Sequence, residues 1–97
     1  MVCEQIIARI KARAEAVKSL GATALYIYGS RARGDDRPHS DLDVYVDFDP
    51  RRFSFVELVA LEDMLSRELG LRVQLGTHDA LHPLVRSQIE REAVRVL

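Results

Sequence analysis

Two aspartates, Asp41 and Asp43, are the residues of this chain best suited to bind a metal ion. They stand in the segment 41–49, where polar and apolar residues alternate strictly, with Tyr45 and Asp47 continuing the polar row. This alternation predicts a half-buried strand with both aspartates on one face. Two carboxylates so close repel each other, and a hard cation such as Mg²⁺ or Mn²⁺ would relieve the repulsion. Taken alone, the pair is better explained as part of the solvated polar face of an edge strand.

A second candidate, Gly29-Ser30, is suited to phosphate chemistry. It follows the apolar, β-branched and aromatic segment 23–28, which is typical of a buried strand, and it precedes a short predicted helix. Free amides at a helix start attract phosphate oxygens, and glycine lets the backbone come close to a ligand. The dipeptide alone also fits a simple turn with a helix cap.

Composition excludes several classes of protein. The net charge is −1, from 14 basic and 15 acidic residues, so a protein that coats nucleic acid by charge is not expected. The single cysteine, Cys3, can form no internal disulfide, and His39, His78 and His82 show no metal-binding spacing. No apolar run is long enough for a membrane span and no signal peptide precedes the first helix, so we expect a cytoplasmic protein.

The elements that must position these residues give an α/β fold in a single domain, residues 1–97. Helices are predicted at 3–20, from Gly29, from Ser54 to Glu68, and from Asp79 or Pro83 onward; strands are predicted at 23–28, 41–49 and 71–76; and 35–40 is a loop. We expect a small mixed sheet of about three to four strands covered by helices, with the strand 71–76 beside the acidic strand.

Apolar spacing also predicts which side of each helix is buried. The first helix would bury Ile6, Ile10, Ala14 and Val17. The Ser54 helix would bury Phe55, Leu58, Val59, Leu61, Leu65 and Leu69. The last helix would run to the C-terminus and bury Leu81, Leu84, Val85, Ile89, Ala93 and Val96.

The two candidates together are more specific than either alone. From Tyr28 to Val44 the chain reads Tyr-Gly-Ser-Arg-Ala-Arg-Gly-Asp-Asp-Arg-Pro-His-Ser-Asp-Leu-Asp-Val. This stretch resembles the signature of the DNA-polymerase-β-like nucleotidyltransferases, and its wording is most similar to the minimal nucleotidyltransferases. The closing Ile-Glu-Arg-Glu-Ala-Val at 89–94 is typical of the same family. The resemblance covers nearly the whole chain and implies the nucleotidyltransferase fold.

The resemblance implies a role for each residue of the motif. Gly29 and Ser30 would hold the triphosphate of ATP, and Asp41 and Asp43 would bind Mg²⁺ or Mn²⁺ as the catalytic pair. Arg33 would contact phosphate or a partner protein, although a solvated charge on a short helix is the alternative.

One position departs from the family pattern. Catalytic members carry a third carboxylate on the strand after the long helix, and here the matching residue is Gln74. An amide can neither accept the proton of an attacking hydroxyl nor replace a charged ligand of a hard cation. Asp47, His78 and Asp79 are nearby in sequence, but none is a convincing substitute.

Two functions therefore stay open. Relatives of this type serve as antitoxins, MntA-like partners of HEPN toxin ribonucleases, and the implied reaction is transfer of AMP from ATP to a tyrosine hydroxyl of the toxin. The alternative is a catalytically silent antitoxin that neutralises its partner by contact, because the third carboxylate position is Gln74. Neither reading involves a membrane or direct binding of nucleic acid.

Overall fold

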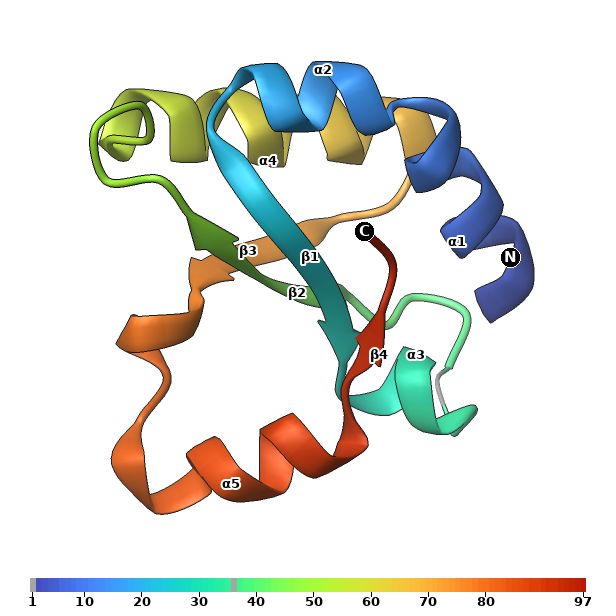
Figure 1. Ribbon diagram of the computed structural model, residues 1–97. Coiled ribbons are helices and arrows are strands. Elements are labelled where there is room, and N and C mark those ends of the chain that lie inside the picture. Colours follow the sequence, from blue (N-terminus) through green and yellow to red (C-terminus); the bar gives the residue numbers. More distant parts are fainter. Residues whose placement is uncertain (1, 36) are drawn as a thin grey trace.

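The computed structural model describes residues 2–35 and 37–97, so Asp36 of the predicted loop lies outside the described residues. A four-stranded sheet lies between helices (Figure 1). The elements are α1 (Cys3–Ala12), α2 (Ala14–Ser19), β1 (Ala22–Tyr28), α3 (Ser30–Arg33), β2 (Leu42–Phe48), α4 (Phe55–Leu69), β3 (Val73–Thr77), the 3₁₀ turn η1 (His78–Ala80), α5 (Pro83–Glu92) and β4 (Val94–Arg95). Within the described ranges, none of the helices combines the length and the apolar character needed to cross a membrane.

The sheet is mixed, as predicted from the sequence. Its strand order is β3-β2-β1-β4; β1 is antiparallel to β2 and β4, and β2 is parallel to β3. The acidic strand β2 therefore lies in the middle of the sheet, beside β3 as expected. In this register Asp43 is opposite Tyr28 of β1 and opposite Gln74 of β3.

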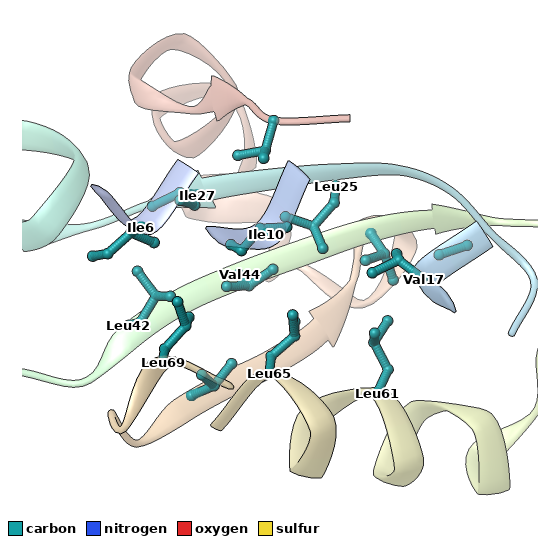
Figure 2. Close-up of a cluster of buried hydrophobic side chains, with 14 of the residues drawn as sticks. Ile6, Ile10, Val17, Leu25, Ile27, Leu42, Val44, Leu61, Leu65 and Leu69 are labelled. Carbon is teal, nitrogen blue, oxygen red and sulfur yellow. The ribbon is translucent and has the colours of Figure 1, made fainter. Parts of the chain in front are cut away.

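The hydrophobic core fills the space between one face of the sheet and helices α1, α2 and α4, as Figure 2 shows. The predicted alternation of β2 places Leu42, Val44 and Val46 on this face, each with no solvent exposure. The other buried members of this core are Ile6, Ile10, Val17, Ala22, Leu25, Ile27, Phe53, Leu61, Leu65, Leu69, Val73 and Val96. Burial of this apolar surface supplies most of the driving force for folding.

Helix α4 also protects the edge of the sheet. Its side chains accept hydrogen bonds from two amides of the edge strand β3: Ser66 Oγ from Val73 N at 3.3 Å, and Glu62 Oε2 from Leu75 N at 3.0 Å. Satisfying these groups removes sites at which another strand could pair. Helix α4 begins after Ser54, as predicted, and a capping box closes its first turn, with Glu57 Oε1 accepting from Ser54 N at 2.8 Å.

Two predicted helix boundaries are wrong. The first helix is interrupted at Arg13, whose backbone (φ −107°, ψ 18°) leaves the helical region and separates α1 from α2. The last helix ends at Glu92 instead of continuing to Val96, because Ala93 turns to extended backbone. The C-terminal residues then pair with β1 as β4, and Val96 N donates to Leu25 O at 2.8 Å. This pairing covers an edge of β1 that would otherwise be open.

The predicted buried sides of two helices also need correction. On α4, Phe55 and Val59 are 76% and 50% exposed, whereas Leu61 is buried. Val59 and Leu61 are two residues apart, so they point about 200° from each other around the helix and cannot share one buried stripe. On α5, the predicted inner residues Leu84 and Val85 are 86% and 42% exposed, because this helix faces the polar side of the sheet.

Candidate active site

The polar face of the sheet is where the predicted site residues meet. It presents Asp43, Tyr45 and Asp47 from β2, beside Tyr28 of β1 and Gln74 of β3. Tyr45 is only 3% exposed despite facing this side, because it stacks with Tyr26 (4.7 Å between ring centroids) and contacts Tyr28 and His78. The face is therefore aromatic as well as acidic.

The backbone of Gly29 lies directly against the carboxylate of Asp43. Gly29 has φ 78° and ψ −156°, which side-chain-bearing residues rarely adopt, and a Cβ at this position would overlap Asp43 Oδ2. Only glycine fits both the conformation and the space. The sharp turn also starts α3, whose single turn carries Ser30 at its first position. The predicted phosphate-binding dipeptide and the predicted metal-binding aspartate are thus immediate neighbours.

The electrostatics of the aspartate pair favour a bound cation. Burial raises the pKa of Asp43 above its ordinary value, the charge of Asp41 raises it further, and the positive charge of Arg33 partly offsets both. Negative charge in this pair is therefore only partly compensated by the protein. Among the described residues, no group of three or more His, Cys, Asp or Glu side chains could hold a metal ion. Two carboxylates fit Mg²⁺ when substrate phosphates and water complete its coordination.

Gln74 occupies the third position predicted from the family pattern, and it contacts the pair. Its Nε2 donates to Asp41 Oδ2 at 3.0 Å, and Arg72 Nε is 3.9 Å from the same oxygen. Gln74 therefore orients Asp41 by donating a hydrogen bond, which an ionised carboxylate at position 74 could not do. As an amide it still offers no site for a proton.

The two arginines of α3 have different roles. Arg31 is 4% exposed, and its Nε and Nη2 donate to Ser40 O at 3.0 and 2.8 Å, which fastens the loop that leads into β2. Arg33 is half exposed; its Nε contacts Asp35 at 3.2 Å and its Nη1 contacts Glu92 of α5 at 3.0 Å. Arg31 stabilises the loop, whereas Arg33 lies on the surface beside the aspartate pair.

A second polar cluster, which sequence reasoning did not assemble, lies further along the same face. The ring of His78 bridges two carboxylates, with Nδ1 at 2.8 Å from Asp47 and Nε2 at 2.6 Å from Glu90. Hydrogen bonds to Glu90 and then to Asp47 raise the pKa of His78, because both favour the imidazolium. The cluster borders a pocket of about 290 Å³ that Asp79 and Arg86 also line. The only sequence signal was that Asp47 continues the acidic row while His78 follows β3 directly.

The second polar cluster is not placed to supply the carboxylate that is missing at position 74. Asp47 and His78 are bonded to each other and to α5, and Asp47 lies four residues along β2 from Asp43. Asp47 and His78 therefore connect the sheet to α5, and they do not join the aspartate pair Asp41 and Asp43. His82 is the N-cap of α5, and its Nδ1 accepts from Leu84 N at 3.1 Å.

Fold and site together define a nucleotide-transferring class of protein: a mixed sheet in which a Gly-Ser turn meets an Asp-x-Asp strand. The nucleotidyltransferase domain family matches residues 10–96. The chain therefore belongs to the nucleotidyltransferase domain family.

Individual proteins of known name or structure show which members of the family this chain resembles. The chain is 36% identical over 78 residues to "Protein adenylyltransferase MntA" of Thermococcus cleftensis, covering 78% of this chain and 76% of that protein. It is 38% identical to the solved "Structure of putative minimal nucleotidyltransferase", with a TM-score of 0.72 over 91% of this chain and 93% of the other. A toxin–antitoxin crystal structure with AMP-PNP shares the fold, at a TM-score of 0.72 and 18% identity over 92% of this chain and 72% of the other. The predicted resemblance to minimal, MntA-like nucleotidyltransferases is thus confirmed.

Proposed function

We propose that this chain binds a Mg²⁺–nucleoside triphosphate and transfers AMP from ATP to a tyrosine hydroxyl of a partner HEPN toxin, acting as its antitoxin in the cytoplasm. Gly29 and Ser30 hold the triphosphate, Asp41 and Asp43 bind the metal, and Arg33 contacts a phosphate. The relatives support this reading, since one is a protein adenylyltransferase and another fold neighbour is a toxin–antitoxin complex with a nucleotide analogue.

The observation that carries the proposal is the contact between the Gly29 backbone and the Asp43 carboxylate. A triphosphate on the Gly29-Ser30 amides would lie within reach of a cation on Asp43 without any rearrangement of the chain. The cation would neutralise phosphate charge and polarise the phosphorus that is attacked. A purely structural turn would gain nothing from placing a glycine backbone against a carboxylate whose charge is already disfavoured.

The reaction forms one bond and breaks one. The acceptor oxygen attacks the α-phosphorus, the bond from that phosphorus to the bridging β-oxygen breaks, and pyrophosphate leaves. Since Gln74 cannot take the hydroxyl proton, that proton passes to water or to the departing pyrophosphate. A phenol, with an ordinary pKa of about 10, makes the smallest demand on an absent base among neutral hydroxyl acceptors. Gln74 thus supports tyrosine over serine or threonine as the acceptor.

The alternative is a catalytically silent antitoxin that binds its partner by contact. Gln74 favours this alternative as well, because loss of a positioned base commonly slows a reaction by about two to four orders of magnitude. In that case the aspartate pair would retain nucleotide without turning it over.

Labelling with ATP that carries a radioactive α-phosphate separates the two. The protein, Mg²⁺ and a lysate of the encoding organism are incubated with wild type, Asp43→Asn, Gln74→Asp and, as a matched control on the same strand face, Asp47→Asn. We expect a labelled protein band with wild type and Asp47→Asn that disappears with Asp43→Asn. A band with Gln74→Asp alone would establish the silent alternative, and the absence of a band in every lane would contradict transfer activity.

A further inference from the structure

Helix α5 is attached to the rest of the molecule chiefly by polar contacts. None of its residues is buried, and Figure 1 shows it on the side of the sheet opposite to α1, α2 and α4. Three contacts with the body involve charged side chains: Glu90 with His78, Arg86 Nη2 with His78 O at 2.8 Å, and Glu92 with Arg33. Polar contacts that are partly solvated contribute less to stability than a buried apolar face, so α5 is expected to open more easily than the core helices.

Glu92 binds the same guanidinium that the proposed function assigns to phosphate. Its Oε2 is 3.0 Å from Arg33 Nη1, while Asp35 engages Arg33 Nε at 3.2 Å. The positive charge of Arg33 also lowers the pKa of Asp43, so this side chain interacts with both the aspartate pair and α5. Carboxylates and phosphates accept the same paired N–H groups of a guanidinium, so the two anions compete for it.

We propose that Glu92 occupies Arg33 when nucleotide is absent, and that a nucleoside triphosphate displaces it. Displacement removes one of the two carboxylate tethers of α5, since Glu90 remains on His78. Nucleotide binding and docking of α5 therefore oppose each other through a single arginine. This inference rests on the proposed function, because it needs a triphosphate beside Arg33.

The test compares two carboxylates that are two residues apart on the same helix. Glu92→Gln and Glu90→Gln change the net charge equally, but only the first removes the carboxylate of α5 from Arg33, which keeps its contact with Asp35. Calorimetric titration with Mg²⁺–ATP is expected to give a dissociation constant about two- to five-fold lower for Glu92→Gln than for wild type, in the range of a surface ion pair. The constant for Glu90→Gln is expected to fall by less than that for Glu92→Gln, because this change loosens α5 but leaves Glu92 able to occupy Arg33.

Hydrogen exchange of the amides of 83–92 supplies the second readout. In wild type, Mg²⁺–ATP is expected to accelerate exchange in this segment; in Glu92→Gln exchange is already faster, and nucleotide adds no further increase. Equal affinities of wild type and Glu92→Gln, an equal gain in Glu90→Gln, or slower exchange of α5 with nucleotide would each overturn the inference while leaving the proposed function intact. Absence of Mg²⁺–ATP binding to wild type would instead contradict the proposed function itself.

Discussion

The two faces of the sheet hold their helices by different forces. On the apolar face, α4 inserts Leu61, Leu65 and Leu69 into a core in which each is at most 2% exposed. On the polar face, α5 buries no residue and is linked through Glu90 and Glu92 to a histidine and an arginine. Apolar burial resists local opening, whereas exposed ionic contacts do so only weakly.

This difference shows that a helix is buried by what lies opposite it as much as by its own sequence. Both helices have apolar residues at helical spacing, and both were predicted to bury them. The acidic row of β2 already excludes an apolar partner on its side, because unpaired carboxylates cannot be covered by leucine without a large cost. Strand alternation is thus the better guide to which helix belongs to the core.

Truncating one leucine on each helix gives the largest contrast. Leu65→Ala should lower the free energy of unfolding by about 2–5 kcal/mol, because it leaves a cavity in the core. Leu84→Ala, the matched change on α5, should change it by less than about 0.5 kcal/mol. Urea unfolding followed by circular dichroism measures both, and a large loss in Leu84→Ala would mean that α5 is packed much as α4 is.

Gly29→Ala tests the close approach of the Gly29 backbone to the carboxylate of Asp43. The added methyl would overlap Asp43 Oδ2, and the positive φ of 78° is strained for alanine. We expect unfolding free energy to fall by about 1–3 kcal/mol. Gly34→Ala serves as a control, since it has a similar φ of 80° but nothing within 4 Å of the added carbon. Equal losses in the two variants would remove the case for a close approach at Asp43.

Asp43→Asn should raise the free energy of unfolding of the metal-free protein, whereas Leu65→Ala lowers it. The pKa of Asp43 is raised in the folded protein, so its stabilising contribution belongs to low pH and is lost as pH rises through that pKa. At neutral pH the ionised side chain therefore destabilises the metal-free protein. Because the site is partly solvated, we expect Asp43→Asn to raise metal-free stability by less than about 1 kcal/mol. Mg²⁺ with ATP should stabilise wild type but not this variant in thermal unfolding, and a drop in metal-free stability would contradict the reasoning.

The smallest expected effect is the pH dependence of α5 docking. Because the pKa of His78 is raised in the folded state, its contribution is complete below the unfolded value of about 6.5 and is lost as pH rises through the folded value. Above that pH, neutral His78 cannot donate to both Asp47 and Glu90. Hydrogen exchange corrected for intrinsic rates should show α5 opening more at pH 9 than at pH 6, with α4 unchanged as the internal reference. Equal protection of α5 at both pH values would mean that protonation of His78 does not help to hold α5 against the sheet.

Strong local patterns made most of the fold predictable. The alternation of β2 and the helix start at Ser54 depend on neighbours in sequence, and both were predicted correctly. The strand β4 was missed because it depends on tertiary context: the pairing of 94–95 with β1 outweighs the helical spacing of Ile89, Ala93 and Val96. The break at Arg13 lies within a continuous helical spacing that gives no sign of it.

The candidate site was predictable only in part. The spacing of Gly29-Ser30 and the two aspartates was visible in the sequence, and the structure brings Gly29 against Asp43. The bond from Gln74 to Asp41 depends on the parallel register of β2 and β3, which sequence spacing does not specify. The contact between Arg33 and Glu92 likewise depends on the tertiary fold, because the two residues are 59 positions apart in the sequence.

The most direct test of the central claim is nuclear magnetic resonance mapping of Mg²⁺–ATP on the isotope-labelled protein. We expect the backbone signals of Gly29, Ser30, Asp41 and Asp43 to shift on titration. The signal of Arg33 should also shift, and those of α4 should not. Asp43→Asn should lose these shifts. Absence of any shift in wild type, or shifts confined to another surface, would contradict a nucleotide site between the Gly-Ser turn and the aspartate pair.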